Sequence, residues 1–260
     1  MAAAKLSSRY EIGLEFDPAY DAALKTFREM VIKSTTRLGT LLGFLEADLP
    51  PGRPPYFKVL FIEATARQLG QQWALDRCDF IDVTIGSAKL QEVILSLSFE
   101  MRLVNPTPST PFAAILTPPG EQHTLMPHLL GLLFDTLEWE RHVLEPNEFG
   151  DPIFATTVDQ ADVACIGWSN SELSDELRTL VAKIRLQRKD RKLPFIVGGA
   201  AALDSIDFLV GLGIDCVCDS VYSAAKTCEN YYELQRISRK AHAGGQTAVI
   251  KTNGIDWLTP

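Results

Sequence analysis

The sequence predicts an N-terminal helical bundle followed by an α/β domain with a doubly wound, parallel sheet of five strands. Apolar residues in the first half recur at three- and four-residue steps, which is typical of packed helices. In the second half, short apolar runs alternate with amphipathic segments, which predicts parallel strands joined by helical crossovers. A proline-rich stretch at residues 105–111 separates the two halves. We therefore expect a bundle over residues 1–104, a linker over residues 105–111 and an α/β domain over residues 112–260.

The first helical pattern begins at Asp17 and Pro18, an N-cap residue followed by proline at the first helical position. It continues to residue 49, where two prolines stop it, and we expect Gly39 and Gly43 to divide it into two helices. A second helix is predicted over residues 56–73 and a third over residues 80–101. The apolar stripe of the third helix runs through Phe80, Val83, Ser87, Leu90, Ile94, Leu97 and Met101.

Five short apolar runs in the second half are each typical of a buried parallel strand. They lie at residues 113–117, 142–144, 163–166, 195–197 and 216–218. Helices are predicted at residues 127–140, 172–192, 204–212 and 223–241. This order of elements predicts a flavodoxin-like, doubly wound sheet with right-handed crossovers.

The charge balance restricts the class of ligand. With 25 Lys and Arg residues against 33 Asp and Glu residues, the chain carries a formal net charge of -8. Such a protein repels phosphate backbones and anionic lipid, which argues against direct binding to DNA or to a membrane surface. Five cysteines, an odd number without Cys-x-x-Cys spacing, favour reduced thiols in the cytoplasm. The sequence shows no secretory signal and no apolar run long enough for a membrane span, so we expect a cytoplasmic protein.

Polar and glycine residues follow three of the predicted strands. Because ligands of open parallel sheets bind at the carboxyl ends of the strands, these loops are the candidate site. A carboxylate such as Glu121 can accept one ring N–H of His123, which makes the other ring nitrogen a better metal ligand. The hydroxyl of Ser169 could extend this chain of hydrogen bonds. Gly198 and Gly199 leave room where a ligand must approach the backbone closely.

The spacing of these residues resembles that of cobalamin-binding domains. Those domains carry Asp-x-His-x-x-Gly, then about 41 or 42 residues before Ser-x-Leu, and about 26 to 28 more before Gly-Gly. Here Glu121-x-His123 takes the first position, residues 127–168 number 42, and residues 172–197 number 26. Both gaps match the pattern of the family.

The resemblance implies a role for each residue of the motif. His123 would be the lower axial ligand of cobalt and would displace the benzimidazole of the cofactor. Glu121 and Ser169 would form a proton relay behind this histidine. The displaced nucleotide tail would descend past Gly198 and Gly199 into a slot beside the sheet.

Two positions depart from the pattern of the family. Met126 stands where the family has glycine, and Ser171 stands where it has leucine. Either side chain would narrow the slot for the nucleotide tail. These departures keep open the alternative of a haem sensor in which His123 ligates iron.

The helical half resembles the caps that cover the upper face of the corrin in corrinoid methyl carriers and in light-responsive cobalamin repressors. The repressors carry Trp-His followed by Glu-His, whereas this chain keeps Trp73, has Ala74 for the first histidine, and has Val83 and Thr84 for the second pair. The resemblance implies that Trp73 shelters the adenosyl or methyl group of adenosyl- or methylcobalamin. Because Ala74 cannot ligate cobalt, we expect water or hydroxide as the upper ligand after light, as in hydroxocobalamin.

Residues 70–90 and the loop at residues 119–123 most resemble the AerR/PpaA antirepressors, which pair a helical cap with a cobalamin domain and bind a DNA-binding repressor of photosystem genes. This resemblance implies a light-responsive regulator of transcription, not an enzyme, whose partner is a DNA-binding repressor protein. The alternatives are a corrinoid methyl-carrier subunit of a methyltransferase, a haem sensor, and an interaction module without a cofactor. The sequence leaves the identity of the partner and the oligomeric state open.

Overall fold

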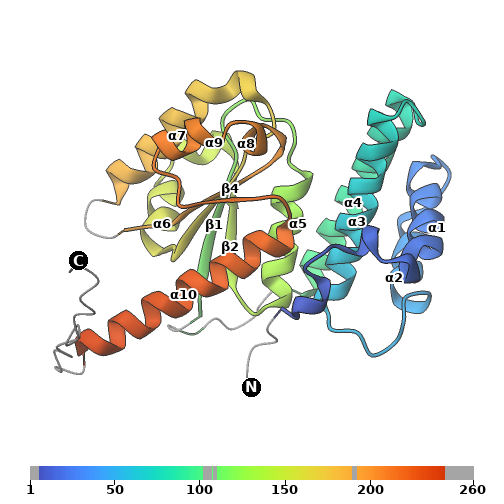
Figure 1. Cartoon of the computed structure of the whole chain (residues 1–260), viewed down its shortest axis with the longest axis horizontal. Coiled ribbons are helices and arrows are strands. Elements are labelled where there is room, and N and C mark those ends of the chain that lie inside the picture. The colour runs from blue at the N-terminus through green and yellow to red at the C-terminus, as the bar shows by residue number, and fades with distance from the viewer. Residues whose placement is uncertain (1–5, 102–106, 108–109, 189–191, 244–260) are drawn as a thin grey trace, which may run out of the picture.

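The chain is described here from a computed structural model over residues 6–101, 107, 110–188 and 192–243. A helical bundle lies beside an α/β part with a central sheet (Figure 1). Most of the predicted linker at residues 105–111 lies outside the described residues. Among the helices of the described part, none combines the length and the apolar character that a membrane crossing requires.

The bundle consists of four helices. They are α1 (Asp21–Ile32), α2 (Leu38–Ala47), α3 (Tyr56–Ala74) and α4 (Phe80–Met101). The predicted start at Asp17 is confirmed, because its side chain accepts a hydrogen bond from Ala19 N at 3.0 Å and caps the short 3-10 turn Pro18–Tyr20 that leads into α1. Two further 3-10 turns, Ser8–Tyr10 and Leu14–Phe16, precede it.

Two details of the predicted bundle were wrong. The break between α1 and α2 falls at residues 33–37, and both Gly39 and Gly43 lie inside α2. A glycine inside a helix costs only about 1 kcal/mol, whereas the polar run Lys-Ser-Thr-Thr-Arg has no apolar side chain to bury. Phe80, the first residue of the predicted stripe, is exposed because it lies at the free end of the helix pair α3 and α4.

The predicted five-stranded parallel sheet is confirmed. Its strands are β1 (Phe112–Leu116), β2 (Glu140–Leu144), β3 (Val163–Gly167), β4 (Phe195–Gly198) and β5 (Cys216–Cys218). They are ordered β2-β1-β3-β4-β5 and are all parallel, with Ala114 in register with His142 on one side and with Ala164 on the other. The order reverses direction between β1 and β3, which is the switch point where such sheets bind ligands.

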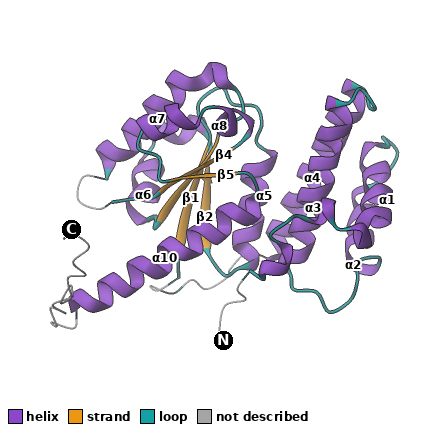
Figure 2. Ribbon diagram, viewed as in Figure 1, coloured by secondary structure: helices purple, strands orange, loops and turns teal. Residues whose placement is uncertain are grey.

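Helices cover both faces of the sheet (Figure 2). They are α5 (Leu125–Thr136), α6 (Pro152–Gln160), α7 (Ser174–Gln187), α8 (Ala200–Asp204), α9 (Ile206–Gly211) and α10 (Val221–Ala243), with 3-10 turns at Pro146–Gly150 and Ser171–Leu173. The helix α6 was not predicted, because it buries only Phe154, Thr157 and Val158 and so has little apolar pattern. The helix predicted over residues 204–212 corresponds to α9, whereas α8, which Ser205 separates from α9, was not predicted.

The helix predicted to run to residue 140 ends at Thr136. Glu138 adopts a left-handed backbone conformation with φ at 60°, which ends the helix and turns the chain into β2. Trp139, in the same connection, stacks on Phe134 with ring centroids 4.9 Å apart. The aromatic contact therefore holds the turn against the helix that precedes it.

Two apolar cores form on the two faces of the sheet. On the outer face, α6, α7, α8 and α9 pack over Ala114, Ile166 and Val197. On the inner face, Ala113, Ile115 and Cys165 contact a core that extends through α5 and α10 into the bundle. Neighbouring residues along each strand alternate between the two cores, as the period of a strand requires. The bundle therefore packs against α5 and α10, which cover this face of the sheet, and the three form a continuous apolar layer.

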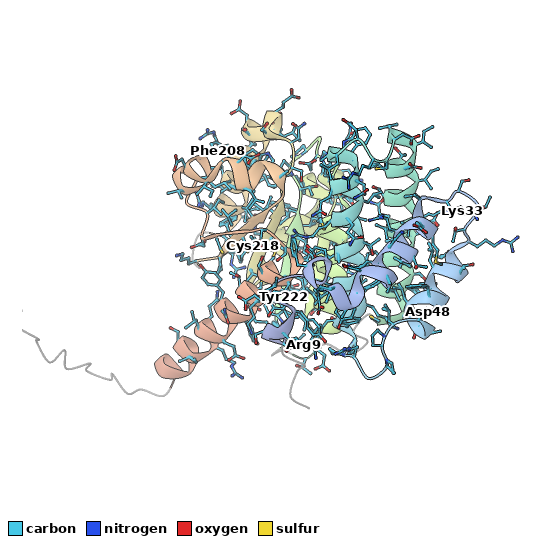
Figure 3. All side chains as sticks on the ribbon, turned by 45° about the vertical axis from the view of Figure 1, so that its right-hand side comes forward. Arg9, Lys33, Asp48, Phe208, Cys218 and Tyr222 are labelled. Atoms are coloured by element: carbon cyan, nitrogen blue, oxygen red, sulfur yellow. The ribbon has the colours of Figure 1, made fainter. Side chains whose placement is uncertain are left out.

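The N-terminal segment crosses from the bundle to the last helix. Figure 3 shows Tyr222, at the start of α10, beside the segment that carries Arg9. The Tyr222 hydroxyl donates a hydrogen bond to Ser7 O at 3.2 Å, and Ser7 N donates to the Tyr56 hydroxyl on α3 at 3.2 Å. These two contacts tie α3 and α10 together at the edge of the sheet that carries β5.

Candidate functional site

The loops after β1 and β3 meet at the switch point of the sheet, where Glu121 is the central residue. Its carboxylate is buried and accepts hydrogen bonds on both oxygens. Oε1 accepts from His123 N at 3.0 Å and lies 2.6 Å from His123 Nδ1. Oε2 accepts from Ser169 N at 2.8 Å and from Asn170 N at 3.0 Å. One carboxylate thus joins the β1 loop to the β3 loop and positions the histidine.

These hydrogen bonds determine the charge of Glu121. Burial alone would raise the pKa of its carboxyl, but the hydrogen bonds from Ser169 N, from His123 and from Asn170 N together lower that pKa below its ordinary value. Glu121 is therefore an anion at neutral pH. An anion beside Nδ1 favours a proton on that nitrogen and leaves Nε2 as the ring nitrogen with a free lone pair.

His123 is the exposed member of the pair. Its side chain is 68% exposed, whereas the side chain of Glu121 is 0% exposed. The imidazole therefore stands at the surface on a buried, charged support. This is the arrangement expected of a ligand that is oriented by the protein and approached from solvent.

A cavity of about 240 Å³ begins beside His123 and runs along the inner face of the sheet. Of the residues predicted for the site, His123, Met126, Ser169, Gly198 and Gly199 line it. The remaining walls are mostly apolar. They include Ile115, Pro127, Leu130, Cys165, Ile166, Ile196, Cys218, Val221 and Ala224.

Of three residues predicted for this site, Ser169 and Ser171 differ from the prediction in their contacts. Ser169 contacts Glu121 through its backbone N–H and not through the hydroxyl that we expected to extend the relay. Met126 is partly buried and lies at the cavity wall. Ser171 is exposed at the start of a 3-10 turn and does not line the cavity.

The residues predicted for the cap lie away from the cavity. Trp73 is 47% exposed near the end of α3, Val83 is partly buried, and the Thr84 hydroxyl donates to Phe80 O at 2.8 Å within α4. Trp73 contacts Phe80, with ring centroids 6.4 Å apart, and both lie where α3 ends and α4 begins. Leu75 and Ile81 are exposed at the same end.

Sequence reasoning missed Glu63 and Arg67, two charged residues of α3 that also line the cavity. Glu63 is only 5% exposed, and its Oε1 accepts a hydrogen bond from Val221 N at the start of α10 at 2.8 Å. Arg67 Nε lies 3.5 Å from Glu63 Oε1 and 3.5 Å from Glu15 Oε1, and the guanidinium also donates to Asp219 O. The sequence does carry a signal, because Glu63 interrupts the apolar run Val-Leu-Phe-Ile-Glu-Ala.

Glu63 gives the folded protein a pH-dependent stability. Burial raises the pKa of its carboxyl from 4.5 to about 7, against the opposing effects of Arg67 and the Val221 N–H, and Glu15 adds to the rise. Folding thus favours the protonated form, so its stabilising contribution is complete below about pH 4.5 and is lost as the pH rises to about 7.

Between about pH 4.5 and about pH 8, we expect the free energy of unfolding of wild type to fall by about 3 kcal/mol relative to that of Glu63→Gln. Each unit of pKa shift corresponds to about 1.4 kcal/mol. Urea unfolding of both proteins across this range measures the difference, and the comparison removes the contributions of the other carboxyls. A constant difference between the two proteins would contradict the expectation.

Comparison with known proteins bears on the fold. No protein-family profile matches the chain. An uncharacterized 20.5 kDa protein of Rhodobacter capsulatus, from the bchF-crtJ intergenic region, is 28% identical over 169 residues, which are 62% of this chain and 84% of the relative. The monomethylamine corrinoid protein of Methanosarcina barkeri superposes with a TM-score of 0.59 at 12% identity, over 80% of this chain and 97% of that one. The bundle and parallel sheet are therefore an architecture that this chain shares with a corrinoid protein.

Proposed function

We propose that this protein binds a cobalamin-type corrinoid through His123 and regulates transcription through a protein partner. The observation that carries the proposal is the Glu121–His123 pair, which is held at the switch point of the sheet and opens on a cavity. The spacing of the motif in the sequence and the fold shared with a corrinoid protein support the same cofactor.

The residues present fit this cofactor. His123 Nε2 is a ring nitrogen oriented by Glu121, and it would hold the metal of such a cofactor. Pockets that enclose a whole ligand usually measure about 300–1,000 Å³. The cavity here, at about 240 Å³, suits one ring system of a larger ligand whose remainder lies outside over His123. When bound, the cofactor would supply a cobalt centre with a light-sensitive cobalt–carbon bond.

The end of the bundle supplies a cover for the outer part of such a ligand. Trp73, Leu75, Phe80 and Ile81 expose a large apolar surface at one end of α3 and α4. Exposed apolar patches of this kind mark binding surfaces more often than free surface. In the proposed role, this surface would exclude water from a bound cofactor.

The regulatory part of the proposal has separate support. The chain has a net charge of -8, which favours a protein partner over direct contact with DNA. The intergenic region in the name of the Rhodobacter relative fits a region of photosynthesis genes, where an antirepressor would act. The fold shared with the Methanosarcina protein favours a second candidate function, a corrinoid methyl carrier, which needs the same site but a methyltransferase as its partner.

Substitution of His123 tests the cofactor. We expect wild type mixed in the dark with adenosylcobalamin to retain the corrin after desalting, with an absorption spectrum that lacks the lower benzimidazole ligand. We expect His123→Ala to lose this spectral change and to bind at least about tenfold more weakly, because the metal loses its protein ligand. His142→Ala on β2 is the matched control, since His142 does not line the cavity.

The outcomes of this experiment separate the candidates. Binding to a DNA-binding repressor that changes on illumination supports a light-responsive regulator, whereas demethylation of the bound methylcorrin by an added corrinoid methyltransferase supports the carrier. Retention of haemin in place of the corrin would leave His123 as a ligand but overturn the cofactor. If neither cofactor survives desalting, the proposal is wrong.

A further inference from the structure

The cavity has one buried carboxyl that the proposed ligation by His123 does not use. Glu63 lines the same cavity as His123, but it comes from α3 in the helical half. Most of the other cavity walls are apolar, among them Leu130, Ile196 and Val221, while Arg67, Asp219 and Ser220 also line the cavity. A polar group placed in such surroundings costs free energy unless it is hydrogen-bonded.

The contacts of Glu63 use only one of its oxygens. Oε1 accepts from Val221 N at 2.8 Å and is the oxygen nearest to Arg67 Nε, at 3.5 Å. In the part of the chain that the structure describes, no hydrogen bond to Oε2 is formed. Arg67 is itself engaged by Glu15 and by Asp219 O. Glu63 therefore keeps one oxygen for a group that enters the cavity.

We propose that Glu63 forms a hydrogen bond with the heterocyclic base of the cofactor's nucleotide tail, an inference that rests on the proposed function. A base displaced from cobalt by His123 exposes a ring nitrogen, and burial of that nitrogen requires a hydrogen-bond partner. The apolar walls suit the faces of a flat aromatic ring, and Glu63 supplies the polar partner at its edge. The phosphate of the tail does not suit this position, since it would meet a carboxylate.

The protonation of Glu63 agrees with this role. Its pKa is about 7, so near neutral pH the carboxyl is partly protonated and can donate to an unprotonated ring nitrogen. When ionised, it can accept from a protonated one. The charged groups that face it are Arg67 on the same helix and Glu15 in the turn Leu14–Phe16, with Asp219 on the far side of Arg67.

A comparison of two ligands isolates the contribution of the nucleotide tail to binding. Cobinamide has the corrin ring but lacks the nucleotide tail, so it can bind to His123 but cannot reach Glu63. The dissociation constants of cobalamin and cobinamide are measured by absorption titration for wild type, Glu63→Leu and Glu63→Gln. Glu15→Leu is the matched control, because Glu15 is a buried carboxylate beside the same Arg67 that does not line this cavity.

We expect Glu63→Leu to raise the dissociation constant of cobalamin about tenfold or more, because a single buried hydrogen bond is lost. The dissociation constant of cobinamide should stay unchanged. Glu63→Gln keeps a donor and an acceptor, so it should bind cobalamin more tightly than Glu63→Leu does. Glu15→Leu should change the dissociation constants of cobalamin and cobinamide by equal factors. The binding of cobinamide also reports that each variant is folded.

Other outcomes overturn the inference. If Glu63→Leu weakens the binding of both ligands equally, or weakens the binding of neither, Glu63 does not contact the base. Wild type could bind both ligands through His123 while the Glu63 variants bind cobalamin and cobinamide in the same ratio as wild type does. In that case the proposed function stands and this inference fails. If wild type binds neither ligand, the proposed function fails and this inference fails with it.

Discussion

Replacement of Glu121 by alanine is expected to destabilise the protein by about 3 kcal/mol and to release His123 from its fixed orientation. The carboxylate accepts from three backbone N–H groups, those of His123, Ser169 and Asn170, and from the imidazole. Each N–H that remains buried without an acceptor costs about 1–3 kcal/mol, and water that enters the space offsets part of this. Urea unfolding at pH 7 measures the loss, and the cobalamin spectrum measures the effect on His123.

Two conservative variants show which property of Glu121 matters. Glu121→Gln keeps the shape but offers one oxygen, so its amide N–H₂ must face either the His123 donors or the donors of Ser169 and Asn170. We expect it to be nearly as unstable as Glu121→Ala. Glu121→Asp keeps both oxygens and the charge, so it should recover most of the stability. A Glu121→Gln protein as stable as wild type would show that the carboxylate does not hold the two loops together.

The fold was predictable from the sequence where burial dictates the pattern. The strands lie between two apolar cores, so they appear as continuous apolar runs, and their parallel direction follows from the alternation with helices. The helix α4 was predicted with its observed bounds because its stripe packs along much of its length. By contrast, α6 was missed because it is short and buries few apolar side chains. The apolar pattern of the sequence therefore predicts a helix or strand more reliably when that element buries more apolar surface.

Part of the candidate site was also predictable. Glu121 and His123 are close in sequence, so a motif can encode their contact. The contribution of Ser169 and Asn170 is made by backbone N–H groups, which no pattern of side chains encodes. Glu63 reaches the cavity only because α3 packs against the start of α10, and Val221 is 158 residues away along the chain. The residues that sequence reasoning missed are those brought in by tertiary packing.

Gly199 is the position in the site where we expect the addition of a single methyl group to lower the stability of the protein most. Its φ is 120° with ψ at 166°, a backbone conformation that is almost restricted to glycine. A Cβ atom at this position would lie 2.3 Å from Trp168 O and 2.8 Å from Ser169 Oγ. Strain and collision together are expected to make Gly199→Ala less stable by about 3–5 kcal/mol. Gly43→Ala is the matched control, since a Cβ there meets nothing within 4 Å and lies inside α2.

The damage from Gly199→Ala should extend to the ligand site. The residue that must move is Trp168, whose backbone N–H donates to Gly198 O at 2.8 Å. The two residues after it, Ser169 and Asn170, donate their backbone N–H groups to Glu121. Displacement of this loop removes hydrogen bonds from Glu121 and so loosens the support of His123. We therefore expect Gly199→Ala to lose both stability and retention of cobalamin, whereas Gly43→Ala gains about 0.5–1 kcal/mol from helix propensity and binds as wild type does. A Gly199→Ala protein with the melting temperature of wild type would mean that the loop can move away without cost, and the close contact with Trp168 would then not explain the glycine.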